Sequence, residues 1–580
     1  MSRSSTKRKP GGRAARSRPV AVAALSLLVL AWPVLPAEAM FRAGAAKLTI
    51  TPPECSPGGP CPGYSLAGSG YGRSSTRVHD DIYVRALAMS GDSESVVLVS
   101  VDVLGHLPDR IRKMQAALHE AYGDQIRLLV DSDGVTARTR TYADGTPVVA
   151  NALIANAHVH ASPDTIGIYG PDELTSGINP AWSDYVDQRV VEVVGLALER
   201  MNANTEGAWV KAAQYHVPGY YGFPLIVDNR EPIILDEDLA VLQVVRNNPQ
   251  EEVISTLVNY SGYPEMMGHD NTEITADFPG VTCGALEETY GGTAIWITRL
   301  IGGFTISYYD VNGNGLADDG GYLPNQFLNT FPGMTAYGLL LADVTREALD
   351  GAFEDRAPEL ELKTDVVNLP VENPFFKILL GEANTVIPGL LGDLWTILAA
   401  WMGMTSIIEP DSTLMLDRSG QGALGATRKV EVLVHVFKIG DALFATSPGQ
   451  LFPELWTGSS PPELLAQPDW VFHPSDLNPA EYEFHPRIPG RAGIRDFIRE
   501  PCQFHLGSTE AELAYLIPDY EFDHSMKTFD DLLCYVTGKH CQPGWFMRYE
   551  ESDSAGREAG NIVQHALIRM ISEFNAGVGQ

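Results

Sequence analysis

The chain is poor in basic residues. It carries 41 Lys and Arg against 73 Asp and Glu, which gives a formal net charge of −32 at pH 7. Such a surface repels nucleic acid and anionic membranes, so neither is an expected partner. The hydrophobic content of 44% is too high for this charge to indicate disorder. The composition therefore predicts a folded acidic protein.

The N-terminus is locally rich in basic residues. The first 18 residues hold seven Lys and Arg, and the uncharged run VAVAALSLLVLAWPVLP follows. A basic segment, an apolar segment and the small residues Ala37 and Ala39 are typical of a secretory signal peptide. We expect a signal peptide at 1–39, cleavage before Met40, and a secreted, extracytoplasmic protein. The alternative is an uncut anchor, but Pro33 and Pro36 leave fewer than the roughly 20 apolar residues that a spanning helix needs.

Cysteine is also scarce, and its spacing excludes a zinc ribbon. In an exported chain an even number of cysteines predicts disulfide bonds. The sequence does not choose the pairs, although two pairs are near neighbours in the chain. The six are Cys55, Cys61, Cys283, Cys502, Cys534 and Cys541.

No internal repeat, low-complexity linker or shift of composition divides residues 40–580. We therefore expect one large domain, although the length would also allow two halves. Short β-branched runs predict strands near 46–50, 82–89, 96–103, 148–155, 253–260, 430–437 and 442–445. Apolar periodicity predicts helices near 111–122, 182–201, 334–352 and 560–574. Alternating strands and helices indicate an α/β architecture with mixed sheets flanked by helices.

One apolar segment, 386–408, departs from this pattern. It contains Trp395, Trp401, Met402 and Met404, interrupted by Pro and Gly. It could be a buried helical hairpin, or a lid facing an apolar substrate, because Met and Trp make adaptable apolar surfaces.

The motif NAHVHASPDTIG predicts chemistry at His158 and His160. The two lie two residues apart at the end of a predicted strand, so their side chains would share a face. Converging imidazoles suit a metal or an acid/base pair, although ordinary strands also carry such pairs.

Three other segments carry candidate residues. A polar loop after the strand at 253–260 concentrates Tyr263, Glu265, His269, Asp270, Glu273, Thr275 and Asp277. Sites are often built on such loops. Gln450 follows a Pro-Gly turn in SPGQLFPEL, and Tyr515 lies in LAYLIPDYEF.

Taken in order, these motifs resemble the neutral/alkaline non-lysosomal ceramidase family, in its wider ceramidase-like branch. The resemblance runs from AGAAKLTITPP through HDDIYVRALAM, VVLVSVDVLG, the His-x-His segment, NYSGYPEMMG, ADFPG, SPGQLFPEL and ELAYLIP to YEESDSAG. It implies an α/β catalytic domain with zinc at the floor of a pocket, and hydrolysis of the N-acyl amide of ceramide. The family's C-terminal immunoglobulin-like domain is not expected, because the chain stops soon after YEESDSAG.

The resemblance also implies four zinc ligands. His158 matches the first His of His-x-His, and Tyr515 matches the late Tyr. Tyr263 stands where the family has His before Pro, and Gln450 where it has Glu after Pro-Gly. A phenol and a neutral amide replace an imidazole and a carboxylate, so we expect a weakened zinc site that His160, Glu265, His269 or Glu454 could supplement.

With zinc in place, the reaction would be metal-assisted attack of water on the amide. His160 would act as the acid/base, and Thr275 falls near the family's hydroxyl-bearing residue. The family's pocket arginine has no evident match. The alternative is a catalytically silent relative that binds a lipid or glycan. It is suggested by Tyr263 and Gln450, the two altered ligand positions.

A second metal is suggested by DVNGNGLADDG. Asp310, Asn312, Asn314 and Asp318 follow the oxygen pattern of a calcium loop, but Gly321 stands where such loops carry a bidentate Glu. The segment predicts either a structural calcium site or an Asn-Gly hairpin turn.

Overall fold

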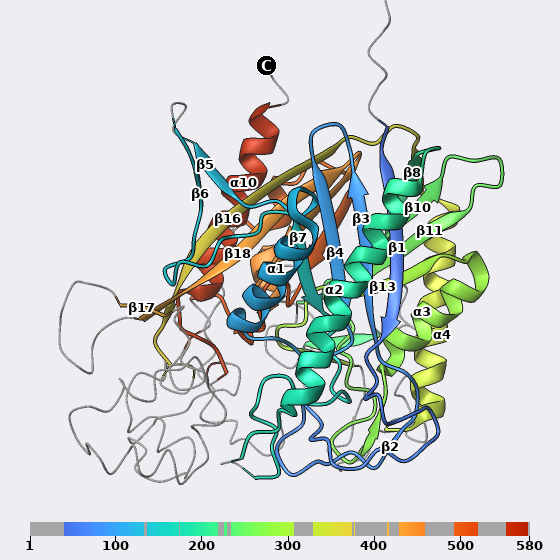
Figure 1. The fold of residues 1–580 in the computed structure, drawn as a ribbon, viewed down its shortest axis with the longest axis vertical. Helices are drawn as coiled ribbons and strands as arrows, with labels where there is room; N and C mark the ends of the chain where they lie inside the picture. The colour runs from blue at the N-terminus through green and yellow to red at the C-terminus, as the bar shows by residue number, and fades with distance from the viewer. Residues whose placement is uncertain are drawn as a thin grey trace, which may run out of the picture. The chain divides into compact units, whose positions relative to one another are not determined.

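In a computed structural model of the chain, three mixed β-sheets are covered by helices (Figure 1). The structure describes residues 40–132, 136–172, 175–217, 225–228, 234–306, 329–373, 376, 414–416, 428–458, 492–519, 522, 551 and 553–577. The signal peptide and the apolar segment 386–408 lie outside these residues.

The first sheet has the strand order β1-β3-β4-β7. Its members are β1 (Arg42–Thr49), β3 (Tyr83–Ser90), β4 (Ser95–Val101) and β7 (Ala152–Asn156). β1 with β3 and β3 with β4 are antiparallel, whereas β4 and β7 are parallel.

The second sheet has the order β13-β11-β10-β8-β15, and only β11 with β13 is parallel. Its members are β13 (Thr293–Thr298), β11 (Val253–Tyr260), β10 (Asp238–Arg246), β8 (Ala208–His216) and β15 (Phe353–Asp355).

The third sheet has the order β16-β18-β19-β21, with β17 also paired to β18, and only β19 with β21 is parallel. Its members are β16 (Leu360–Val371), β17 (Leu414–Leu416), β18 (Arg428–Ile439), β19 (Ala442–Thr446) and β21 (Cys502–Leu506). Four short two-stranded pairs complete the described strands: β2 (Arg77–Val78) with β12 (Glu273–Ile274), β9 (Ile226–Asp228) with β14 (Phe304–Ile306), β20 (Gln450–Leu451) with β22 (Tyr515–Leu516), and β5 (Val130–Ser132) with β6 (Ala137–Thr139).

The first sheet packs against the other two through one apolar cluster. Leu87 and Leu98 meet Leu257 and Ile295 there, and stacked Phe437 and Phe444 extend the cluster onto the third sheet. Burial of this apolar surface is the main force that holds the sheets together.

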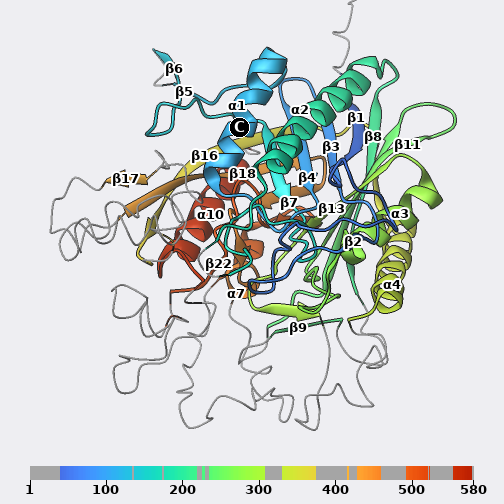
Figure 2. The ribbon, with the colours of Figure 1, turned by 60° about the horizontal axis from the view of Figure 1, so that its bottom comes forward.

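Helices cover the outer faces. α1 (Pro108–Tyr122) and α2 (Pro180–Ala203) cover the first sheet, and Figure 1 shows α2 running along β1 and β3. α3 (Asp277–Tyr290) and α4 (Phe331–Asp350) lie on the second sheet, and α10 (Ala559–Gly577) lies on the third (Figure 2).

Local sequence explains where these helices begin. The side chain of Asn179 accepts a hydrogen bond from the amide of Trp182, and Pro180 follows as the first helical residue of α2. Thr330 caps α4 in the same way through the amide of Gly333. Such caps satisfy amides that have no partner within the helix.

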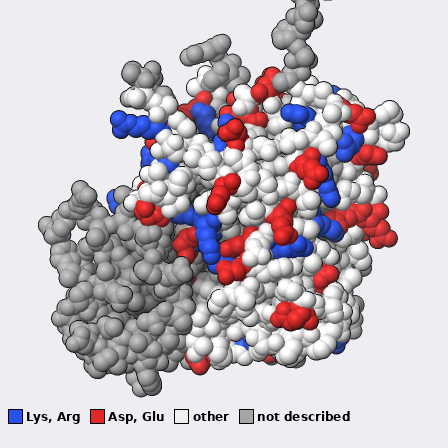
Figure 3. Space-filling view, viewed as in Figure 1, with Lys and Arg blue, Asp and Glu red and all other residues white. Residues whose placement is uncertain are grey.

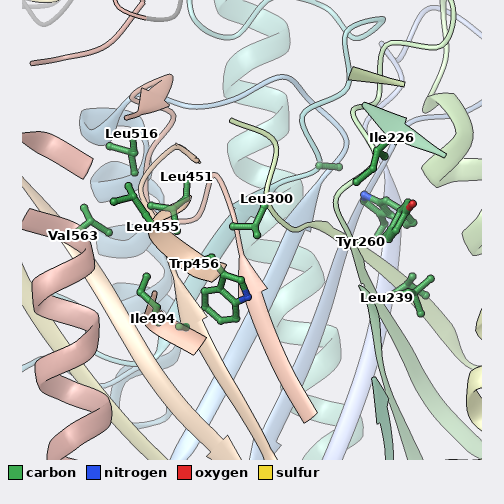
Figure 4. Close-up of a cluster of buried hydrophobic side chains, with 14 of the residues drawn as sticks. Ile226, Leu239, Tyr260, Leu300, Leu451, Leu455, Trp456, Ile494, Leu516 and Val563 are labelled. Carbon is green, nitrogen blue, oxygen red and sulfur yellow. The ribbon is translucent and has the colours of Figure 1, made fainter. Parts of the chain in front are cut away.

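The largest core cluster joins residues of the second and third sheets. In Figure 4, Trp456 and Leu300 lie between Val563 of α10 and Leu239 of β10. Trp456 belongs to the short helix α7 (Pro453–Thr457) and is fully buried. The loops that follow the central strands are therefore anchored in the core.

The expected fold class is confirmed. Residues Ala39–Gln580 form one compact unit of mixed sheets flanked by helices. Every predicted strand and helix is present within a few residues. One expectation was wrong: Asp277, predicted to lie in a loop, is the first residue of α3.

Of the six cysteines, Cys55 and Cys61 form a disulfide bond. Cys283 and Cys502 are buried free thiols, so the expected disulfide bonding is confirmed for Cys55 and Cys61 and does not extend to these two. The two lie in separate apolar clusters, so packing keeps them apart. Cys534 and Cys541 lie outside the described residues. Among the helices that are described, none is both long and apolar enough to cross a membrane.

Candidate active site

Three of the predicted site residues come together at strand ends. His158 follows β7, Tyr263 follows β11, and Gln450 follows β19. Each of these strands has a parallel neighbour in its sheet. In sheets of this kind, the loops beyond the carboxyl ends of parallel strands commonly build binding sites.

His158 reaches the cluster through an unusual backbone conformation. Its φ is 62°, in the left-handed region that non-glycine residues seldom adopt. Its buried ring places Nε2 3.1 Å from the hydroxyl of Tyr263. The two histidines therefore converge, but through a turn after β7 and not through the strand alternation that the sequence suggested. Backbone strain of this kind is often found at functional sites.

His160 lies beside both of these side chains. Its ring centroid is 5.2 Å from that of His158 and 5.0 Å from that of Tyr263. Burial, then the neighbouring charges of His158 and Arg73, hold the pKa of His160 well below its usual value. Nε2 of His160 is buried without a hydrogen-bond partner among the residues that the structure describes. A neutral imidazole with an unused nitrogen can exchange a proton with a bound molecule.

The backbone around His160 is held from two sides. Its amide donates a 3.0 Å hydrogen bond to the carbonyl of Pro264, which joins the His-x-His segment to the segment after β11. The guanidinium of Arg73 donates to the carbonyl oxygens of His160, Ala67 and Gly268. Burial lowers the pKa of Arg73 to about 10. Arg73 thus ties three segments of backbone together.

Gln450 and Glu512 complete a ring of polar contacts. The hydroxyl of Tyr263 donates to Oε1 of Gln450 at 3.2 Å, and Nε2 of Gln450 donates to Oε1 of Glu512 at 3.3 Å. Oε2 of Glu512 lies 3.3 Å from Nδ1 of His158. Since His158 also contacts Tyr263, the four side chains form a closed circuit.

Glu512 was missed by the sequence analysis. It lies between β21 and β22, three residues before Tyr515. Glu510, two residues earlier, lies 3.4 Å from His435 in a different buried pair. No local pattern distinguishes these two acids. Proximity to Tyr515 in the chain was the one available signal.

Tyr515 is placed beside Gln450 by backbone pairing. The two are register partners in the parallel pair β20-β22, and the amide of Gln450 donates to the carbonyl of Ala514. The buried ring of Tyr515 lies edge-on to Phe452, with 6.0 Å between centroids.

The residues predicted to supplement the metal site lie in three different places. The carboxylate of Glu265 is 4.0 Å from Nδ1 of His160, so it borders the cluster. Glu454 is buried in α7. His269 has a side chain 77% exposed, paired with Asp270 at 3.3 Å, so the structure does not bring it to His158.

Thr275 is buried close to the His-x-His segment. Its amide donates to the carbonyl of Ala161, and its hydroxyl donates to Oδ2 of Asp80 at 2.5 Å. The hydroxyl also accepts a hydrogen bond from the amide of Asp277. Thr275 therefore connects the start of α3 to the segment that carries His160.

The four positions matched to zinc ligands do not suit zinc well. Structural and catalytic zinc sites use His, Cys, Asp and Glu, and His158 alone is of these types. Within the described parts of the chain, no three such side chains gather in a way that could hold a metal ion. Gln450 adds no negative charge, and its oxygen already accepts a hydrogen bond from the hydroxyl of Tyr263. The predicted calcium ligands Asp310, Asn312, Asn314 and Asp318 lie outside the described residues.

Comparisons with known proteins bear on the fold. No protein-family model matches the sequence. No curated protein matches it either. The similar solved structures include the neutral ceramidase from Pseudomonas aeruginosa and a ceramidase complexed with C2.

The neutral ceramidase is 14% identical with a TM-score of 0.55, and the match covers 92% of this chain and 74% of that one. The complexed ceramidase is 13% identical with a TM-score of 0.56, over 93% of this chain and 76% of that one. At this identity the likeness establishes architecture, over nearly the whole chain. The protein therefore has the fold of the neutral ceramidases.

Proposed function

We propose that the protein is a secreted hydrolase that cleaves the N-acyl amide bond of ceramide or a related lipid amide. The observation that carries the proposal is the convergence of His158, His160 and Tyr263 beyond the strand ends of a ceramidase fold. An acid/base pair beside a hydroxyl is suited to amide hydrolysis, because water must lose a proton and the leaving amine must gain one.

His160 is the acid/base in this proposal. The lowered pKa of its imidazole leaves it neutral near pH 7, so its free Nε2 can take a proton from an attacking water and return it to the amine. Arg73 and the amide bond to Pro264 hold the backbone of His160 in place. Thr275 is a positioning residue, since its hydroxyl already contacts Asp80.

We assign no step of this reaction to zinc, because the donor set does not fit the ion. The second candidate function is binding of a lipid or glycan without catalysis. It is favoured by Gln450, a neutral amide at the position where the resemblance implies a ligand carboxylate.

Hydrolysis of a ceramide with a fluorescent acyl chain, followed by release of the labelled fatty acid, tests the proposal. We expect turnover by the secreted protein and a loss of about 100-fold or more in kcat for His160→Ala, the usual range for removal of an acid/base. His216→Ala is the matched control, because the side chain of His216 is exposed and its charged partner is Asp238, which is not one of the site residues. Saturable binding of the ceramide without release of the acid would favour the silent relative.

A further inference from the structure

We propose that the side-chain ring closed by Glu512 takes the place of a metal ion, so that this site binds no zinc. The ring consists of His158, Tyr263, Gln450 and Glu512. This inference uses the same site as the proposed function. It concerns what holds the site together, and its test does not depend on turnover.

Glu512 supplies the negative charge that Gln450 lacks. Its buried carboxylate accepts hydrogen bonds from the hydroxyl of Ser508, the amide of Ala514 and Nε2 of Gln450. Nδ1 of His158 lies 3.3 Å away. A buried carboxylate is stable only when donors of this kind surround it.

The backbone at Gly105 and His106 lies close against Glu512. Its amide donates to the carbonyl of His106 at 2.8 Å. A Cβ atom on Gly105 would lie 2.3 Å from Cβ of Glu512, so only glycine at this position allows the approach. The surrounding backbone therefore fixes the position of Glu512, which acts as a positioning residue for His158.

The hydrogen bonds of the ring occupy Nε2 of His158, the hydroxyl of Tyr263 and the amide group of Gln450. Tyr263 uses its one proton toward Oε1 of Gln450, so its oxygen accepts from Nε2 of His158. Gln450 in turn uses its amide protons toward Glu512. A zinc ion would have to displace these contacts, and among the four positions matched to zinc ligands only His158 would offer it an ordinary ligand.

Restoring the two altered positions should convert the ring into a metal site. The double variant Tyr263→His with Gln450→Glu would place two imidazoles and one carboxylate at the same three strand ends. Three such ligands with one open position are the usual composition of a catalytic zinc site.

The experiment is elemental analysis of the secreted protein after incubation with excess zinc and removal of unbound metal. Wild type should contain less than about 0.1 zinc per chain, and the double variant about one, as a three-ligand site would hold. Adding His158→Ala to the double variant should abolish the gain. The melting temperature measured with and without zinc gives a second readout, since a bound ion stabilises the folded state.

Stoichiometric zinc in wild type that is lost in His158→Ala would overturn the inference. A folded double variant that stays free of zinc would also overturn it, because the two substitutions would then not explain the loss of the metal. Zinc-free wild type that releases no fatty acid from ceramide would instead contradict the proposed function and leave the inference standing. Zinc-dependent turnover of ceramide by wild type would support the proposed function and contradict the inference.

Discussion

At the scale of single residues, two buried residues at or near the His-x-His segment have strained backbone conformations. His158 and Asp277 both have φ in the left-handed region, at 62° and 53°. The carboxylate of Asp277 accepts a 2.6 Å hydrogen bond from the amide of Phe278. Burial nevertheless raises the pKa of Asp277 to about 7, with a further contribution from Asp80. A carboxyl group in this environment loses its proton reluctantly near neutral pH.

This raised pKa predicts a pH-dependent stability. Asp277 titrates at its ordinary pKa of 3.8 in the unfolded chain and at about 7 in the folded one. Between these values the folded state binds more protons, so its stability falls as pH rises. The loss reaches up to about 4 kcal/mol above pH 7, at 1.36 kcal/mol per pKa unit.

Asp277→Asn removes the titration and keeps a side chain that tolerates a positive φ. We expect the difference in unfolding free energy, variant minus wild type, to grow from pH 5 to pH 8 by about 1 to 3 kcal/mol. Urea unfolding at both pH values measures it, and the comparison with wild type cancels the other titrating groups. An unchanged difference would show that Asp277 is not responsible.

At the scale of elements, β1 and α2 approach each other closely. Gly44 of β1 is buried against the last turns of α2. A Cβ atom at this position would lie 2.1 Å from the amide nitrogen of Met201 and 2.5 Å from the carbonyl oxygen of Ala197. Both contacts are with backbone, which cannot move aside as a flexible side chain does.

Gly44→Ala should therefore destabilise the protein, by about 1 to 3 kcal/mol, the usual cost of overpacking a core. The matched control is Gly284→Ala in α3. Gly284 is exposed, and an added Cβ would meet nothing within 4 Å. The control should gain about 0.5 to 1 kcal/mol from helix propensity. Thermal unfolding of the two variants tests the pair, and equal effects would contradict the packing argument.

At the scale of the whole molecule, charge is distributed without a large basic patch on the face that Figure 3 shows. Acidic and basic side chains alternate there over α1 and α2, where Arg110 pairs with Asp184 and Asp187. The net charge of −32 disfavours polyanionic partners.

Export of the whole chain remains a prediction. We expect the mature protein to begin at or within a few residues of Met40, because Ala37 and Ala39 suit a signal peptidase. Intact-mass measurement of secreted protein checks this. A mass that includes the basic N-terminal segment would contradict cleavage.

The state of the cysteines gives a second test of the whole molecule. Alkylation of denatured, unreduced protein should modify Cys283 and Cys502, because both are free thiols. Cys55 and Cys61 should react only after reduction. In the native protein the two thiols should react slowly, since burial raises the pKa of Cys283 to about 12 and that of Cys502 to about 11. Mass mapping of the alkylated peptides distinguishes these states. Reaction of Cys55 without reductant would contradict the disulfide bond.

The sequence by itself determined the local structure and the broad fold class. Strands such as 253–260 and helices such as 182–201 were predictable because burial of one face imposes a period of two or of 3.6 residues. Motif order pointed to a ceramidase-like fold, and the comparisons with solved structures confirm that architecture. His158, Tyr263 and Gln450 were identified as one site through that resemblance.

Only the tertiary structure decided what surrounds His158. Glu512 lies hundreds of residues away in the chain, and nothing local separates it from Glu510. Arg73 was missed for the same reason, since its partners are backbone carbonyl groups that any residue could supply. His269, expected near the site, is exposed because its loop turns away after β11. Periodicity in sequence reports which face of an element is buried, whereas the meeting of distant side chains depends on how sheets and loops pack.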